Sequence, residues 1–281
     1  MQIIGCDFSS SPSKRKPIVV AISEDFLSQI GTQPIQNMRC VLSKIERFET
    51  LDLWSEWLGR DVQWVGGFDL PFGLPRELVE TLNWPTDWRT CMAHYASLTR
   101  EEIRATFKAF CDARPVGGKF AHRAADLPAG SSPSMKWVNP PVAYMLHAGV
   151  PRLIEAGCHF PGLLKGNASK VALEAYPGFL AREIIGSRSY KSDDKAKQTP
   201  ERLIARKDIL TALENGQTRL AIRLKLSNAQ RELLIDDASG DSLDAVLCML
   251  QAAWGYAKHA EGKKNYGLPK FDPLEGWILT A

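Results

Sequence analysis

Two predicted strands of this sequence end on an aspartate. Asp7 closes the apolar segment 2–6, and Asp69 closes the segment 62–68, within the stretch GGFDLPFGLP. An ionised carboxylate at the end of an apolar strand is costly to remove from water unless a cation or hydrogen-bond donors meet it. Considered alone, Asp69 fits a turn residue whose side chain caps nearby backbone N–H groups, because aspartate is common in turns. The remaining acidic positions decide between a turn residue and a ligand.

Three other acidic residues also lie in or at the end of predicted apolar elements. Glu174 lies in the predicted strand 171–176, where glutamate is depleted. Asp241 and Asp244 open the last predicted helix, and their spacing puts them on one helix face. Acidic side chains also favour helix N-termini, so Asp241 fits a helix cap as readily as a ligand. Asp244 lies further inside the helix and is the better ligand candidate.

Carboxylates gathered at one sheet edge repel one another and raise each other's pKa values. Divalent ions relieve that repulsion, and Mg²⁺ prefers hard oxygen ligands. Two such ions can activate a water and stabilise a leaving oxygen in phosphodiester cleavage. We therefore expect a Mg²⁺ or Mn²⁺ site formed by Asp7, Asp69, Asp241 and Asp244. The catalytic carboxylates are expected to be Asp7, Asp69, Glu174 and Asp244.

The elements that position these acids follow from the hydrophobic pattern. Short links between the first three predicted strands indicate an antiparallel meander, since parallel pairing needs a crossover of a dozen residues or more. These strands cover residues 2–6, 17–22 and 39–43. Residues 50–59 have a helical spacing that supplies such a crossover, so the strand that ends at Asp69 is predicted to run parallel to the first. Asp7 and Asp69 are then expected at the carboxyl edge of the sheet, where ligands bind.

The pattern changes after Pro75. We expect one domain over residues 1–281, with a helical insert at about 76–166. The insert contains the Gly-, Pro- and Ser-rich stretch 115–141, and loops of that length are usually functional or disordered. Because the insert leaves at Asp69 and returns before Glu174, we expect it to form a wall over the acidic edge. The later predicted elements are a strand at 171–176, a polar helical region at 200–234, a helix from about 240 and a terminal strand at 276–279.

Composition describes an ordinary globular protein. Of 281 residues, 44% are hydrophobic and 24% charged, and the net charge of +3 is too small to demand a nucleic-acid partner, although it allows a local basic groove. The N-terminus has no signal-peptide pattern, and no apolar stretch approaches the roughly 20 residues that span a bilayer. The six cysteines are scattered without a C-x-x-C pair, which predicts reduced thiols and a cytoplasmic protein.

An ordered set of short motifs resembles a poorly characterised bacterial family of predicted RNase-H-like nucleases. The motifs are GCDFSS (5–10), GGFDLPFGLP (66–75), LEAYPG (173–178), DSLDAVLCMLQAAW (241–254) and LEGWIL (274–279). The resemblance implies an α/β fold with a ribonuclease-H-like mixed sheet, a three-strand meander plus parallel strands flanked by helices. It also implies that Asp7, Asp69 and Asp244 are metal ligands, with Glu174 and Asp241 close by.

The chain departs from that family in one respect. Typical ribonucleases H carry a glutamate on the helix after the third strand, and Glu56 is not a convincing match for it. Glu174 would have to take its place.

The expected function is a metal-dependent nuclease, with basic and aromatic residues that bind a nucleic acid of unspecified type. Their cations would contact phosphates, and the tryptophan would stack on an unpaired base. These residues are Arg114, Lys119, Arg123, Lys136, Trp137 and Lys191. Arg123 and Asp126 could equally form a structural pair.

Two alternatives remain open. An ATP-dependent phosphotransferase of the actin-like type would use DFSSSPSK, after the first strand, as a phosphate loop, although this loop lacks the glycine that lets backbone N–H groups approach phosphate. A non-catalytic nucleic-acid-binding module would use the basic stretch 188–207. Because this stretch also carries acids, an ordinary solvated surface fits it about as well.

Overall fold

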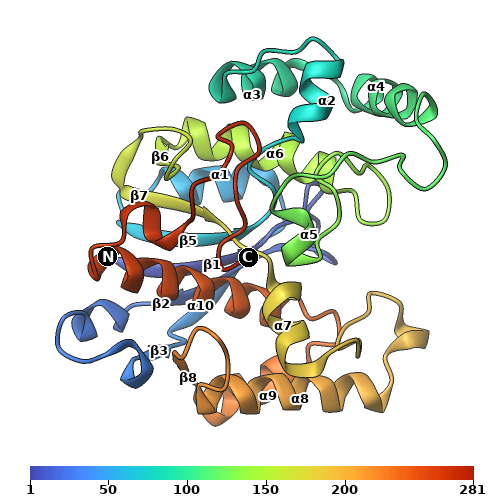
Figure 1. The fold of residues 1–281 in the computed structure, drawn as a ribbon. Coiled ribbons are helices and arrows are strands. Elements are labelled where there is room, and N and C mark those ends of the chain that lie inside the picture. The colour runs from blue at the N-terminus through green and yellow to red at the C-terminus, as the bar shows by residue number, and fades with distance from the viewer.

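The computed structural model describes residues 1–281 apart from the side chain of Leu27. Within the described chain, a mixed six-stranded sheet has the order β4-β2-β1-β5-β7-β6 (Figure 1). Its strands are β1 (Gln2–Asp7), β2 (Ile18–Ser23), β4 (Lys44–Phe48), β5 (Trp64–Asp69), β6 (Cys158–His159) and β7 (Asn167–Glu174). Of these six strands, β2 runs in the direction opposite to the other five. The expected α/β class with a mixed sheet is confirmed.

The third strand of the meander is β4 and not the segment 39–43 that the apolar pattern predicted. The sheet uses β4, whereas residues 39–43 contribute β3 (Arg39–Val41), which pairs with β8 (Arg223–Lys225) in a separate two-stranded sheet. The sequence of β4, KIERF, is largely polar because it is an edge strand with much of its surface in water. The more apolar segment 39–43 instead packs Cys40 into the hydrophobic core that contains Leu243 and Leu247, called the second core below.

Two other predicted strands also need correction. The strand expected at 171–176 begins earlier and ends at Glu174. The terminal strand expected at 276–279 does not form, because a single backbone hydrogen bond, from Leu279 N–H to Glu174 O at 2.8 Å, joins this segment to the sheet in place of a ladder.

The expected crossover is present as α1 (Leu51–Gly59). Its first turn is capped by Thr50, whose side chain accepts a hydrogen bond from Leu53 N–H, and it buries Trp54, Trp57 and Leu58. This helix carries the chain from the end of β4 to the start of β5, so β5 lies parallel to β1 as predicted. The first core, on this face of the sheet, also includes Trp64 and Phe68.

The segment from β5 to residue 155 is made of helices and loops. It contains α2 (Arg76–Thr81), α3 (Trp88–Ser97), α4 (Arg100–Asp112), α5 (Asp126–Ala129) and α6 (Val142–Glu155). An aromatic cluster joins α3 and α4, with Tyr95 stacked on Phe107 at 5.9 Å and Trp84 6.0 Å from each ring. In Figure 1 these helices lie on the opposite side of the sheet from α8 and α9.

The second face of the sheet is covered by α10 (Asp241–Ala260), which packs on β1, β2 and β5. Beyond it lie α7 (Pro177–Ile185), α8 (Pro200–Asn215) and α9 (Asn228–Asp236). The polar helical region expected at 200–234 is thus two helices separated by β8, a strand too short to leave a periodic signal. Short 3₁₀ helices occupy connections at Phe26–Gln29, Ile35–Asn37, Lys195–Lys197 and Lys264–Gly267. In the described part of the chain, no helix is long and apolar enough to cross a membrane.

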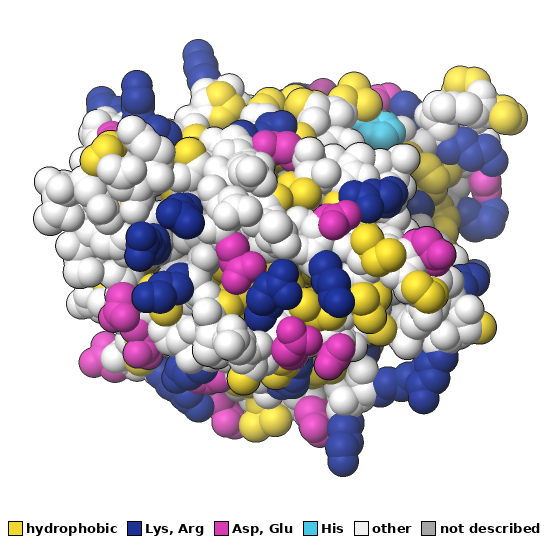
Figure 2. All heavy atoms as spheres, turned by 90° about the horizontal axis from the view of Figure 1, so that it is seen from below, with side chains coloured by type: hydrophobic (Ala, Val, Ile, Leu, Met, Phe, Trp, Pro, Cys, Tyr) yellow, Lys and Arg dark blue, Asp and Glu magenta, His cyan; other side chains and the backbone are white. Residues whose placement is uncertain are grey.

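The face that carries α8 and α9 has mixed charge. Figure 2 shows Lys and Arg side chains interspersed with Asp and Glu on this side of the molecule. Several form ion pairs, including Arg188 with Asp208 at 2.7 Å and Arg231 with Glu214 at 3.1 Å. The basic stretch 188–207 therefore lies on a mixed-charge surface, which is the solvated alternative weighed for it.

Candidate metal centre

Asp7 and Asp69 end two neighbouring parallel strands at the same level. The register of β1 and β5 pairs Asp7 directly with Asp69. Adjacent strands lie about 4.8 Å apart, so the two side chains leave the sheet edge side by side. Asp7 is buried, with 8% of its surface exposed, and Asp69 is half-buried.

A pair of glycines lets α10 approach this edge closely. Gly5 and Gly67 face each other on β1 and β5. A Cβ atom on Gly5 would stand 2.0 Å from the backbone nitrogen of Met249, and one on Gly67 would stand 2.4 Å from the carbonyl oxygen of Cys248. The helix backbone therefore lies directly on the two strands. One turn before Cys248, it presents Asp244.

Asp244 is fully buried and joins the two strand-end aspartates. Its carboxylate accepts hydrogen bonds from the Tyr190 hydroxyl and the Lys191 ammonium group. Burial, followed by the charge of Asp244, raises the pKa of Asp7 well above its ordinary value. The same two causes raise the pKa of Asp69 to about 7. Burial also raises the pKa of Asp244, against the opposing charge of Lys191.

Asp241 lies at the same end of α10 and is not its cap. The residue before the helix is Gly240, in a left-handed conformation, and one free N–H group of the first turn, that of Ser242, donates to Asp237 at 2.9 Å. Asp241 is 4% exposed and accepts from the Lys16 ammonium group at 3.0 Å. The capping alternative considered for Asp241 is therefore wrong.

The carboxylate oxygens of these aspartates are ligands that suit a hard divalent cation. In this structure, however, lysine ammonium groups bind two of the carboxylates. Among the residues that the structure describes, no three His, Cys, Asp or Glu side chains are arranged to hold an ion as they stand. Lys191 is bound to Asp244 and Lys16 to Asp241, so positive charge already lies where the carboxylates need it. The Lys191 side chain is 41% exposed, whereas the Asp244 carboxylate that it binds is fully buried.

Glu174 does not join this group as a free carboxylate. One oxygen accepts from Arg123 Nη2 at 2.7 Å, and the other accepts from Arg123 Nη1 and from Phe72 N–H, both at 2.9 Å. Burial raises the pKa of Glu174, and Arg123 opposes this rise. With both oxygens engaged, Glu174 is a structural carboxylate, which corrects the catalytic role expected for it.

Arg123 is likewise a structural residue and not a substrate contact. Its side chain is 2% exposed, and all five guanidinium N–H groups are used, by Asp126, by Glu174 and by the carbonyl oxygen of Glu275. No donor of this guanidinium is left for a phosphate. The structural alternative noted for Arg123 and Asp126 is the one that the structure contains.

The other residues expected to bind substrate are dispersed. Arg114 pairs with Glu77 and lies 4.8 Å over the ring of Phe110. Trp137 packs on Phe120 with ring centroids 5.6 Å apart. Arg114, Lys119, Lys136 and Trp137 do not line the cavity beside the carboxylates, and of the six expected residues Lys191 alone reaches the acidic cluster. Glu56, on α1, is exposed.

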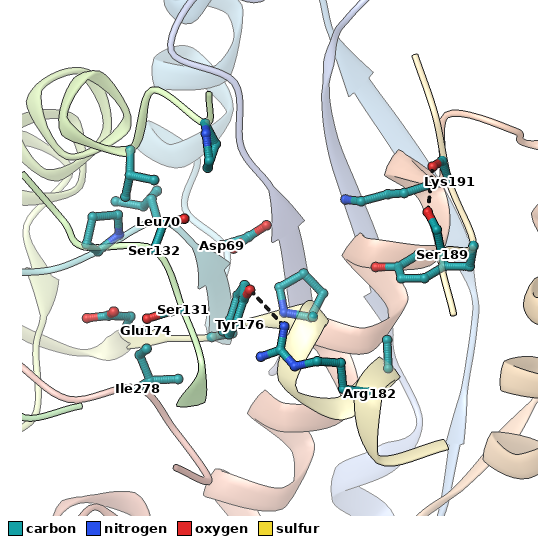
Figure 3. Close-up of a pocket in the computed structure, with 18 of the residues that line it drawn as sticks. Asp69, Leu70, Ser131, Ser132, Glu174, Tyr176, Arg182, Ser189, Lys191 and Ile278 are labelled. Carbon is teal, nitrogen blue, oxygen red and sulfur yellow. Dashed lines mark hydrogen bonds between the residues drawn. The ribbon is translucent and has the colours of Figure 1, made fainter. Parts of the chain in front are cut away.

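That cavity opens directly from the acidic edge. Its volume is about 500 Å³, and Asp69, Tyr190 and Lys191 form part of its wall (Figure 3). Residues of the stretch 115–141 line it as well, among them Ser131 and Ser132. This part of the insert therefore lies on the same side as the acidic edge, as expected for a wall.

Sequence reasoning missed Tyr190 and Lys16. Tyr190 lies in an irregular segment where no periodicity marks it, so its contact with Asp244 could not be foreseen. The position of Lys16 near the acids could have been inferred, because the hairpin between β1 and β2 returns the chain beside Asp7.

No family model, curated protein or solved structure matches this chain.

Proposed function

We propose that this protein is a divalent-metal-dependent nuclease that hydrolyses phosphodiester bonds in nucleic acid. The observation that carries the proposal is the meeting of Asp7, Asp69 and Asp244 from three separate elements at one sheet edge. Buried acids that raise each other's pKa are unfavourable without a cation, and such groups cluster at functional sites.

The topology supports a ribonuclease-H-like fold. Apart from the two-residue strand β6 at one edge, the strands of the main sheet follow the chain as β1, β2, β4, β5 and β7, and these five lie in the order 3-2-1-4-5. The second of them runs antiparallel to the rest. A helix between the third and fourth strands and an acid-bearing helix across the sheet complete the arrangement implied by the motif resemblance.

In this proposal, Asp7, Asp69 and Asp244 hold Mg²⁺ or Mn²⁺, with Asp241 beside them. When bound, the metal supplies an activated water and stabilises the leaving oxygen. Tyr190 orients Asp244 through its hydroxyl group. With Asp244 holding the metal, the Lys191 ammonium group would be available to a phosphate oxygen of the substrate.

No observation favours the two alternative functions. Lys16, two residues beyond the stretch DFSSSPSK proposed as a phosphate loop, is already paired with Asp193 at 2.8 Å and with Asp241. The surface proposed for a non-catalytic binding module carries both signs of charge.

The test compares wild type with Asp69→Asn, which keeps the shape of the side chain and removes its charge. Wild type should cleave nucleic acid only with Mg²⁺ or Mn²⁺, and the variant should lose at least about 100-fold in rate, as when one transition-state contact is removed. Metal that binds only the folded state raises Tm. Millimolar Mn²⁺ should therefore raise Tm in wild type and much less in the variant.

The matched control is Asp61→Asn, an exposed aspartate just before β5. It should retain both cleavage and the Mn²⁺-induced rise in Tm. If Asp69→Asn shows the same metal-induced rise as wild type, Asp69 is a turn residue and the proposal loses its main support.

A further inference from the structure

The cavity of about 500 Å³ is continuous with the acidic cluster. Asp69 belongs to both, and Lys191, which is bound to Asp244, lines the cavity from the other side (Figure 3). Pockets for small ligands are usually about 300–1,000 Å³, so the cavity is large enough for a base and its sugar. A group bound here would stand directly beside the carboxylates.

The body of the cavity is largely apolar. Leu70, Val142, Met145, Ala181, Ile185 and Ile278 are among the residues that form its walls. The walls come from β5, α6, α7 and the C-terminal segment. Such a surface favours a flat, weakly polar group over a charged one.

The charged residues in the deeper wall are already satisfied. Arg123 and Glu174 bind each other. Arg182 lies over the ring of Tyr176 at 5.2 Å, donates to its hydroxyl at 3.2 Å and contacts the carbonyl oxygens of Ala129 and Gly130. The charged side chains of the wall that border the acidic cluster are Asp69 and Lys191, and Lys191 is itself bound to Asp244. A ligand with a charged group at one end and an uncharged ring at the other matches this distribution.

We propose that the cavity receives the base of one unpaired nucleotide while the adjoining phosphodiester lies at the carboxylates. The inference rests on the proposed nuclease function and names its substrate class, a single-stranded or frayed nucleic acid. In a duplex each base is stacked and paired, so it must leave the helix before it can enter a pocket of this size. Fully paired nucleic acid cannot occupy the cavity.

The experiment measures binding of a short fluorescent oligonucleotide by anisotropy, with Ca²⁺ in place of Mg²⁺ to prevent turnover. The probes are a single strand and a blunt duplex of the same sequence. Ser132→Trp and Ser189→Trp fill the cavity from two different segments. The control is Ser28→Trp, at an exposed serine outside the cavity.

Wild type should bind the single strand roughly tenfold or more tightly than the duplex, and each cavity variant should lose about the same factor, as expected when one stacked base is excluded. The control should bind as wild type does. A nucleoside monophosphate should compete with the oligonucleotide, whereas ribose 5-phosphate should not. This competition uses wild-type protein alone. It therefore shows whether the cavity binds a base even if a tryptophan substitution prevents folding.

Equal affinity for duplex and single strand, unchanged binding by folded cavity variants, or equal competition by the two phosphates would overturn the inference. Cleavage with Mn²⁺ is measured in parallel. Cleavage that is indifferent to the cavity variants removes the inference and leaves the nuclease. Base-dependent binding without any cleavage keeps the cavity assignment and removes the nuclease.

Discussion

Asp69 carries a carboxyl group that the fold holds partly protonated near neutral pH, because burial and the charge of Asp244 raise its pKa to about 7. In the unfolded chain an aspartate titrates near 3.9. The raised pKa means that protonation favours the folded state. This stabilising contribution is complete below about pH 4 and is lost as pH rises through about 7.

The metal-free protein should therefore lose stability between pH 5 and pH 8. Urea unfolding in the presence of a chelator should give a lower midpoint at pH 8 than at pH 5 for wild type. Asp69→Asn should show a smaller fall, because one titrating group is gone while Asp7 and Asp244 remain. Asp61→Asn should follow wild type, and an equal fall in all three proteins would contradict the raised pKa of Asp69.

Tyr190 offers a second test at the residue scale. Tyr190→Phe removes the buried hydroxyl that donates to Asp244, and a hydrogen bond to a charged group contributes about 1.5–3 kcal/mol. The variant should be less stable by that amount and should bind Mn²⁺ more weakly, because Asp244 is less well oriented.

Tyr95→Phe is the matched control for this change. The Tyr95 hydroxyl is also buried and donates to the carbonyl oxygen of Ala143 at 3.0 Å. Thermal melts with and without Mn²⁺ should show a stability loss in both variants and a weaker metal response in Tyr190→Phe alone. A normal metal response in Tyr190→Phe would remove Tyr190 from the site.

At the scale of elements, the metal centre depends on the contact of α10 with β1 and β5. Gly5 and Gly67 remove two side chains between helix and sheet, which lets the helix backbone reach the strands. The helix is buried along most of its length, so its position is set by packing in the second core. Asp244 reaches the strand-end aspartates because the helix lies this close.

Gly5→Ala should therefore affect stability and the site together. Its Cβ would clash with backbone atoms of α10, which cannot rotate away, so a loss of about 3 kcal/mol or more is expected. Weaker Mn²⁺ binding should accompany it as Asp244 moves. Gly59→Ala, where a Cβ meets nothing within 4 Å, should be neutral or slightly stabilising. Calorimetry with Mn²⁺ and urea unfolding measure both effects, and a Gly5→Ala protein of wild-type stability would contradict this packing.

At the scale of the whole molecule, one buried ion network joins distant segments around the end of β7. Arg123 binds Glu174, the last residue of that strand, and also Asp126 and the backbone of Glu275. The Glu275 carboxylate in turn accepts from Ala124 N–H at 2.8 Å and from Arg76 N–H at 2.9 Å. The insert, the sheet and the C-terminal segment are thereby held together beside the cavity.

Arg123→Met should destabilise the protein by about 3–5 kcal/mol, because it leaves two carboxylates buried without their cation. For a chain of this size the fall in Tm should be on the order of 10 °C. Arg188→Met, which breaks an exposed pair with Asp208, should change stability by less than about 1 kcal/mol. Differential scanning calorimetry compares the two, and a small effect of Arg123→Met would show that the network is not a structural anchor.

The sequence by itself determined the strands that end at Asp7 and Asp69, the crossover that makes them parallel, and the helix that carries Asp244. Those features depend on hydrophobic periodicity and short connections, which are local. Only the tertiary structure decided which side chains meet. Arg123 pairs with Glu174 across 51 residues, and Lys191 reaches Asp244 across 53. The tertiary structure also decided that β4, a polar edge segment, is the third strand of the meander, because an edge strand needs little apolar surface to pair. The packing of helices and strands determines which residues so far apart in sequence come into contact. The local hydrophobic pattern of the sequence carries no information on that packing.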